Sequence, residues 1–166
     1  RLLHVLEDTV QLPDGKTAVR EYIRHPGAVM MVPLLDERTV ILVRQFRYPV
    51  GEVTLEIPAG KLDGGESKLS CLRRELREET GYGARRVTKL LDYWPTPAFA
   101  NEVLSLYVAE GLISGQRSPD EDEFLEVVTM PFERALSRVR SGEIRDSKTV
   151  IALLACALWR RTRQRP

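Results

Sequence analysis

The sequence has few cysteines and no excess of either charge. Its two cysteines, Cys71 and Cys156, are far apart and lie in helix-like stretches. This placement indicates packed, reduced thiols rather than a disulfide framework, so we expect a cytoplasmic protein. Lysine and arginine together number 25, and aspartate and glutamate 24. The overall charge therefore gives no reason to expect nucleic acid or an anionic membrane as the main partner.

Long apolar runs are also missing. The longest, VIALLACALW at residues 150–159, has about half of the residues that a membrane-spanning helix needs. No secretory signal, internal repeat, low-complexity tract or linker stands out in the sequence. We therefore expect a single domain over residues 1–166, with no membrane partner and a core of ordinary size.

Apolar segments separated by turn residues predict several strands. These segments are residues 28–35, 39–46, 53–60, 87–94, 102–110 and 124–130. The first two are predicted to form a hairpin, because only a short polar turn separates them. Pro58 and Gly60 are predicted to end the third, since proline cannot donate to a strand ladder and glycine permits unusual dihedral angles.

Two helices are predicted near the end of the chain. The first begins at Pro131 and stops at Gly142, and the second begins at a capping residue, Asp146 or Ser147, and runs to residue 159. The basic residues 160–166 are predicted to form a frayed, solvated end rather than a nucleic-acid site. Strands, a helix, more strands and then helices together predict an α/β or α+β fold with helices packed on a mixed sheet.

Residues 60–82, GKLDGGESKLSCLRRELREETGY, combine a glycine-rich loop with an acidic helix. At about 100° per residue, Leu69, Leu72 and Leu76 form an apolar stripe. The acidic side chains occupy a neighbouring arc roughly 100° wide, and they are Glu75, Glu78 and Glu79. Because like charges at this spacing weaken a helix by a few tenths of a kcal/mol each, they require compensation. The neighbouring arginines could neutralise a solvated face, or a hard divalent cation could bind the oxygens.

The spacing of these residues is too specific for chance. Seven positions are fixed, namely Gly60, Glu66, Arg74, Glu75, Glu78, Glu79 and Gly81. At about 7% each, they coincide by chance on the order of once in 10⁸ starting points. The pattern resembles the signature of the Nudix hydrolases, in which these residues form a loop-helix-loop. The sequence matches every fixed position and departs only at Tyr82, where the family usually has an aliphatic residue.

The resemblance implies a Nudix α/β/α sandwich with a mixed β-sheet. It implies that Glu75 and Glu79 are the main ligands of Mg²⁺ or Mn²⁺, with Glu78 close by and the backbone carbonyl of Ala59 completing the site. Arg74 would orient a glutamate, for which Glu66 is the expected choice. Metal ions at such a site can bridge diphosphate oxygens and lower the pKa of a bound water.

The flanking segments are similar to the ADP-ribose pyrophosphatase branch of this family. They are HPGAVMMVP (residues 25–33), VRQFRYPVG (43–51) and LEIPAGKLD (55–63). Pro97 stands fifteen residues after Tyr82, where that branch characteristically has a proline, although Ala98 follows where many members have glycine. The branch implies hydrolysis of ADP-ribose to AMP and ribose 5-phosphate. Other nucleoside diphosphate sugars, such as GDP-mannose or ADP-glucose, and a non-catalytic ligand-binding domain remain alternatives.

Three charged residues upstream of the signature are candidates for substrate binding. Arg44 and Arg47 are three residues apart, so one could face a phosphate while the other forms a surface ion pair. The branch pattern implies that Arg47 is the diphosphate contact. Glu56 lies in an apolar strand, where an unpaired charge is costly, so it needs a partner. The sequence leaves open whether this partner is substrate, metal or an arginine.

A general base is also required. The branch implies that an acidic loop supplies it, and SPDEDEFLEVV (residues 118–128) matches the position of that loop. Glu123 aligns best and Glu121 is the alternative, while a solvated acidic turn would also explain the segment. The branch further implies a homodimer, to which the N-terminal strands within residues 1–27 contribute and in which Arg20 reaches the partner's site.

Overall fold

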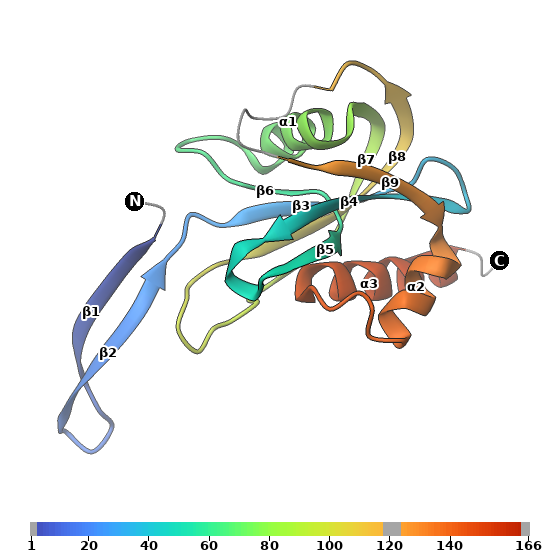
Figure 1. Cartoon of the computed structure of the whole chain (residues 1–166). Helices are drawn as coiled ribbons and strands as arrows, with labels where there is room; N and C mark the ends of the chain where they lie inside the picture. Colours follow the sequence, from blue (N-terminus) through green and yellow to red (C-terminus); the bar gives the residue numbers. More distant parts are fainter. Residues whose placement is uncertain (1–2, 118–123, 164–166) are drawn as a thin grey trace.

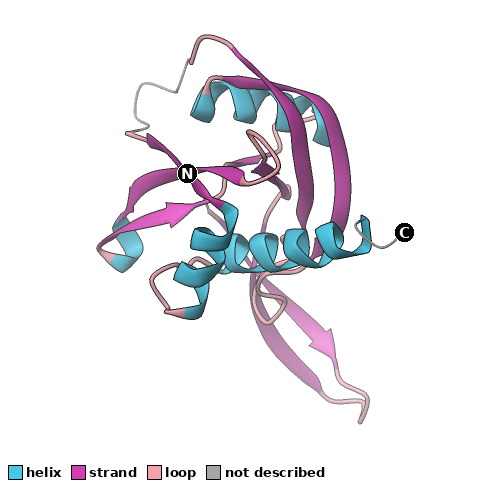
Figure 2. Cartoon of the chain, turned by 90° about the vertical axis from the view of Figure 1, so that its right-hand side faces the viewer, coloured by secondary structure: helices cyan, strands magenta, loops and turns pink. Residues whose placement is uncertain are grey.

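The computed structural model describes residues 3–117 and 124–163, which fold into helix, sheet and helix layers (Figure 1). Helix α1 (Lys68–Thr80) covers one side of the strands. Helices α2 (Phe132–Arg140) and α3 (Ser147–Arg163) cover the other side, and Figure 2 shows the same layering from the side. The predicted fold class, helices packed on a mixed sheet, is confirmed.

Two sheets make up the middle layer. The larger has the order β6-β3-β8-β7, with bounds Ala59–Lys61, Ala28–Pro33, Leu104–Ser114 and Tyr82–Tyr93. Strands β3 and β8 are parallel, whereas the other neighbours are antiparallel. The smaller sheet is antiparallel and has the order β5-β4-β9, with bounds Glu52–Glu56, Thr39–Arg47 and Glu126–Pro131. A 3-10 turn, η1 (Tyr48–Val50), joins β4 to β5.

Two segments that the sequence predicts to be a hairpin or a single strand are split between the two sheets. The predicted hairpin of residues 28–35 and 39–46 is wrong, because β3 and β4 bridge only at Leu34 and Val40 and belong to different sheets. Residues 53–60 likewise end one strand and begin another, since the chain passes from β5 to β6 between them. A fully apolar strand can pair on either side, so hydrophobic patterning does not select its neighbour.

Strand β3 is buried on both faces and separates two parts of the core. Val29 and Met31 pack in one cluster with Leu72 and Leu76 of α1. The alternate residues of β3 belong to a second cluster with α2 and α3, whose members include Met30, Val32, Leu106, Ala135 and Leu153. This alternation follows from the two-residue period of a strand. As a result, α1 packs on the face of β3 that carries Val29 and Met31.

Helix α1 begins and ends within the signature segment, residues 60–82. The Ser67 hydroxyl caps it by accepting the Ser70 N–H at 3.1 Å, and Gly81 ends it with a φ of 79°, which favours glycine. The predicted apolar stripe is correct for Leu72 and Leu76 but wrong for Leu69, which is 49% exposed. Cys71 is buried instead, because the helix is rotated so that part of its acidic arc faces the protein.

The N-terminal residues form a hairpin that projects from the body (Figure 1). It consists of β1 (His4–Gln11) and β2 (Thr17–Arg24). Its base is joined to the loop after β7, where the Ile23 N–H donates to the Phe99 carbonyl at 2.8 Å. No helix among residues 3–117 and 124–163 combines the length and apolar character that crossing a membrane requires.

Candidate active site

Two signature glutamates turn inward against the backbone of β6. Glu75 is 8% exposed and Glu79 is 4% exposed. The Ala59 N–H donates to Glu79 Oε2 at 3.2 Å. A Cβ atom at Gly60 would lie only 1.8 Å from Cδ and Oε1 of Glu75. Position 60 must therefore be glycine if the Glu75 carboxylate is to occupy this place.

Arg74 connects three acidic residues of the signature. Its Nη1 donates to Glu75 Oε1 at 2.7 Å and to Glu78 Oε2 at 2.9 Å. Its Nε and Nη2 donate to the two carboxylate oxygens of Glu66 at 3.3 and 3.1 Å. The hydrogen bond with Glu66 is the main cause that raises the pKa of Arg74, and the nearby charge of Glu75 adds to it. Arg74 therefore holds the loop glutamate and the helix glutamates in one network.

The donor atoms gathered here suit a hard cation. Carboxylates of Glu75 and Glu79 lie beside the main chain of Ala59 and Gly60, and oxygen donors of this kind are those that Mg²⁺ and Mn²⁺ prefer. Among the described residues, no three acidic, histidine or cysteine side chains are already arranged as a metal cluster. Glu78 is turned toward Arg74, so its carboxylate would have to change partner to become a ligand.

A second charged cluster surrounds Glu56. This carboxylate is 1% exposed and accepts two hydrogen bonds from Arg47, Nε to Oε1 at 2.8 Å and Nη2 to Oε2 at 2.7 Å. The Lys148 ammonium also donates to Oε2. The partners that the sequence left open are thus an arginine and a lysine. Sequence reasoning missed Lys148, because it lies 92 positions after Glu56 and no local pattern connects them.

The two clusters are electrostatically connected. The hydrogen bond with Glu56 raises the pKa of Arg47, burial opposes this effect, and the charges of Glu56, Asp146 and Glu79 add to it. Arg47 therefore lies within electrostatic range of Glu79.

The buried Glu56 carboxyl makes the stability of the protein depend on pH. Burial alone would raise its pKa, but hydrogen bonds from Arg47 and the charge of Lys148 outweigh burial and lower the pKa to about 2. Because the folded pKa is below the unfolded value near 4.5, the stabilisation is complete above pH 4.5 and is lost between pH 4.5 and 2.

We expect this group to account for about 3 kcal/mol of the fall in unfolding free energy over that range. Urea unfolding at pH 7 and pH 3 would capture about 2 kcal/mol of this fall, because pH 3 lies partway through the range. In a Glu56→Gln variant the fall should be smaller by about the same amount. An identical pH dependence in the wild type and in this variant would contradict the assignment.

The remaining candidate residues that the structure describes belong to neither of these two clusters. Arg44 forms an exposed ion pair with Glu126 at 2.7 Å, which is one of the two roles that the sequence left open. Pro97 is exposed in the turn after β7. Arg20 is exposed on β2, in the projecting hairpin. Glu123 and its alternative Glu121 lie outside the described residues, so the general base stays a prediction.

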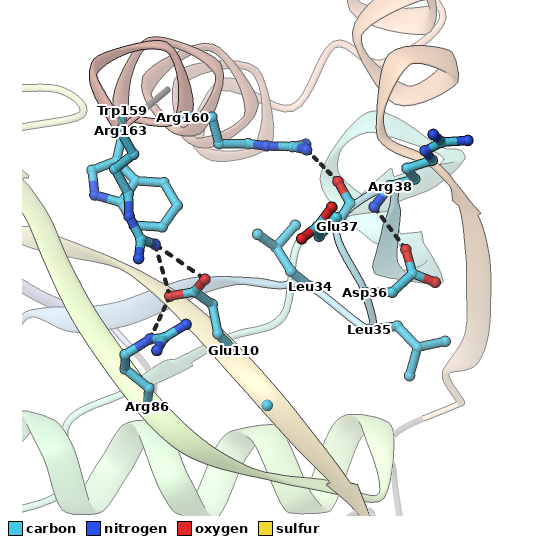
Figure 3. Close-up of a pocket in the computed structure, with 11 residues that line it drawn as sticks. Leu34, Leu35, Asp36, Glu37, Arg38, Arg86, Glu110, Trp159, Arg160 and Arg163 are labelled. Carbon is cyan, nitrogen blue, oxygen red and sulfur yellow. Dashed lines mark hydrogen bonds and ion pairs between the residues drawn. The ribbon is translucent and has the colours of Figure 1, made fainter. Parts of the chain in front are cut away.

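A cavity of about 720 Å³ lies at the end of α3 that is remote from Lys148 (Figure 3). Glu110 in its wall accepts hydrogen bonds from Arg86 at 2.8 Å and from Arg163 at 3.2 Å. The hydrogen bond from Arg86 is the main cause of the lowered pKa of Glu110. The Arg160 guanidinium lies 4.8 Å from the centre of the Phe132 ring.

These contacts show that the predicted frayed end is wrong as far as Arg163, which is helical. Residues 164–166 lie outside the described residues. The ion pairs of Glu110 fasten the end of α3 to β7 and β8. No predicted site residue that the structure describes lines this cavity, so we interpret its charged wall as structural.

Layers of helix, sheet and helix, with a glutamate-bearing helix seated on a short strand, are the architecture of a Nudix-type hydrolase. The NUDIX domain model matches residues 24–153, and the chain belongs to this family. It is a Nudix hydrolase. Members of the family generally need a divalent metal ion.

Curated relatives and a solved structure resemble most of the chain. An ADP-ribose pyrophosphatase of Bacillus subtilis (strain 168) is 42% identical over 155 residues, which are 92% of this chain and 84% of the relative. A methanol dehydrogenase activator of Bacillus methanolicus is 41% identical with the same coverage. A GDP-mannose pyrophosphatase of Salmonella typhimurium is 40% identical over 80% of this chain and 73% of the relative.

A solved structure supports the fold along the whole of this chain. A crystal structure of an ADP compounds hydrolase superimposes with a TM-score of 0.89 and 28% sequence identity, covering 100% of this chain and 90% of that chain. The similarity therefore includes the projecting hairpin as well as the signature helix.

Proposed function

We propose that the protein hydrolyses the diphosphate of a nucleoside diphosphate sugar, with ADP-ribose as the preferred substrate and AMP and ribose 5-phosphate as products. The observation that carries this proposal is the pair of buried glutamates, Glu75 and Glu79, held against the backbone of Ala59 and Gly60. Names of relatives support the reaction class, since two of them are pyrophosphatases of ADP-ribose and GDP-mannose.

In this proposal Glu75, Glu79, Glu78 and the Ala59 carbonyl hold Mg²⁺ or Mn²⁺. Such ions, when bound, neutralise diphosphate charge and lower the pKa of a bound water. Arg74 keeps Glu66 and the helix glutamates in position.

Arg47 contacts the diphosphate, because the guanidinium fork matches phosphate oxygens. Glu123 accepts a proton from the water that attacks phosphorus, and the bond from that phosphorus to the bridging oxygen breaks. Arg44 and Pro97 are the remaining proposed substrate contacts, and for this role Arg44 would have to leave its ion pair with Glu126.

Sequence identity does not choose the substrate. Relatives with three different activities in their names are 40 to 42% identical to this chain, so GDP-mannose and ADP-glucose remain rival substrates. A non-catalytic ligand-binding domain is disfavoured, because every glutamate of the signature is present and two of them are buried beside the β6 backbone.

A substrate panel tests the proposal. We expect purified protein with Mg²⁺ to convert ADP-ribose to AMP and ribose 5-phosphate, identified by mass, with a higher kcat/KM than for GDP-mannose or ADP-glucose. Only kcat/KM ranks competing substrates, because it reports differential binding of their transition states. Turnover of none of these compounds with either Mg²⁺ or Mn²⁺ would favour the ligand-binding alternative.

We also propose a homodimer in which the N-terminal hairpin packs on a second copy and Arg20 reaches that copy's site. The hairpin exposes Val5 (64%) and Val19 (53%), whose strand register places both on one face. A two-stranded hairpin is marginally stable by itself, so a partner surface would stabilise it. Sedimentation should give about twice the chain mass of 18.9 kDa, and Val5→Asp with Val19→Asp should give monomers. A monomeric wild type would exclude this arrangement.

Further expectations from the sequence stay predictions. These are a single domain over residues 1–166, a cytoplasmic location, and the lack of a nucleic-acid or membrane partner. The location is supported by the thiols of Cys71 and Cys156, which are free and buried. Burial raises the pKa of each to about 12, so neither is suited to thiolate chemistry.

A further inference from the structure

Lys148 is largely shielded from solvent and shares the Glu56 carboxylate with Arg47, the residue that is proposed to bind diphosphate. It is the second residue of α3, and its side chain is 14% exposed. Its ammonium donates to Glu56 Oε2 and, at 2.9 Å, to Asp146 Oδ2. The same Asp146 oxygen caps α3 by accepting the Thr149 N–H at 2.9 Å. The start of the helix therefore sets the position of the lysine.

The end of β5 is fastened to the same helix start. The Ile57 N–H donates to the Thr149 hydroxyl at 2.9 Å, and that hydroxyl donates to Asp146 Oδ2 at 2.5 Å. Glu56, one residue earlier, also accepts from the Thr54 hydroxyl at 2.5 Å. The Glu56 carboxylate is thus held from the strand side by Thr54 and from the helix side by Lys148. It offers Arg47 a fixed acceptor rather than a rotating one.

Two cations share the single Glu56 carboxylate, and they differ in exposure. The Lys148 side chain is 14% exposed, whereas the Arg47 side chain is 45% exposed. Arg47 uses Nε and Nη2 for Glu56, and in the described part of the chain its Nη1 has no acceptor. Arg47 and Lys148 together balance the carboxylates of Glu56 and Asp146, so loss of Lys148 would leave one net negative charge beside the exposed side of Arg47. Without Lys148, the carboxylate would be balanced by Arg47 alone.

We propose that Lys148 is a positioning residue for substrate binding: acting through Glu56, it fixes the guanidinium of Arg47 and offsets negative charge that would otherwise repel the diphosphate there. This inference rests on the proposed function, in which Arg47 contacts the diphosphate. Lys148 itself does not touch the substrate. Asp146 and Thr149 serve the same purpose by holding the lysine and the start of α3 in place.

The first test separates the charge of Lys148 from its packing. In Lys148→Gln, which keeps a hydrogen-bond donor but loses the charge, we expect KM for ADP-ribose to rise roughly tenfold, by analogy with the loss seen when the partner of a metal ligand is replaced. The kcat should change less than KM, and Lys148→Arg should restore most of the affinity. Lys89→Met serves as the control, because Lys89 forms an exposed ion pair with Asp92 at 2.7 Å. This variant should leave KM unchanged. A KM of Lys148→Gln within twofold of wild type would overturn the proposal.

The second test asks whether Lys148 acts through Arg47. Coupled residues give non-additive effects in a double-mutant cycle. In an Arg47→Met background, Lys148→Gln should no longer change KM, although its effect on the melting temperature should persist. An equal rise of KM in both backgrounds would show that Lys148 has only a general structural role. If Arg47→Met by itself left KM unchanged, the proposed function of Arg47 would fail instead. Binding of ADP-ribose measured calorimetrically without metal should give the same ranking as KM.

Discussion

Replacing Glu79 by glutamine is expected to lower kcat by at least about 100-fold, which corresponds to roughly 3 kcal/mol of transition-state stabilisation. Glutamine has nearly the same shape, and its side-chain oxygen can still accept the Ala59 N–H that now donates to Glu79 Oε2 at 3.2 Å. The change therefore removes a negative charge and a metal ligand while keeping the local packing. Steady-state kinetics over a range of Mg²⁺ concentrations, with Mn²⁺ binding measured by calorimetry, would test it.

The melting temperature of Glu79→Gln distinguishes the expected loss of kcat from a loss caused by unfolding. Glu75 and Glu79 are two buried carboxylates one helical turn apart, so neutralising one of them should not lower the metal-free melting temperature by more than a few degrees. Active sites often keep destabilising groups for the sake of function, so removing one of these charges need not destabilise the fold. The matched control is Glu133→Gln, at an exposed glutamate in the first turn of α2, which should keep wild-type activity. Turnover of Glu79→Gln within tenfold of wild type would remove Glu79 from the set of metal ligands.

Replacing Gly60 by alanine is expected to reduce kcat/KM by roughly 100-fold, with a loss of unfolding free energy limited to about 1–3 kcal/mol. The new methyl group would lie 1.8 Å from the Glu75 carboxylate, so that carboxylate has to move. The end of a glutamate side chain can rotate away, and overpacking costs about 1–3 kcal/mol. The displaced atoms, however, are the proposed metal ligands, and misplaced ligands weaken the site far more than they destabilise the fold.

The same glycine-rich loop supplies the control. A Cβ atom at Gly64 would meet nothing within 4 Å, so Gly64→Ala should leave activity and melting temperature close to wild type. Comparison of the two variants isolates the contact with Glu75 from any general need for glycine in the loop. Full activity of Gly60→Ala would mean that the described position of Glu75 is not the position used in the reaction.

Local patterns were enough to predict much of the fold. The apolar alternation gave the main strands, Pro131 and Gly142 bracketed α2, and Asp146 was one of two candidates for the cap of α3. The spacing of the signature placed a loop and a helix at residues 60–82, and the described helix is bounded by Ser67 and Gly81. These features depend on residues close in sequence, so the pattern carries them.

The predictions that failed all concern partners distant in the chain. Residues 28–35 and 39–46 look like a hairpin. In the structure β3 packs into a core cluster on each of its faces, and β4 belongs to another sheet. Leu69 fits an apolar stripe, yet the rotation of α1 exposes it. The arginines at 160–163 look like a solvated tail, whereas Glu110 and Phe132 hold them on the surface of the body. In each case packing between distant elements decided the outcome.

The sequence by itself determined the family, the fold class and the identity of the acidic residues, because a spacing pattern within one loop and helix specifies which side chains share an arc. Only the tertiary structure decided that Glu75 and Glu79 turn inward against β6, that Glu56 is held by Arg47 and Lys148, and that Arg47 lies within range of Glu79. The reason is physical: a buried charge needs an opposite charge in space, and chain folding can bring that partner from 92 positions away.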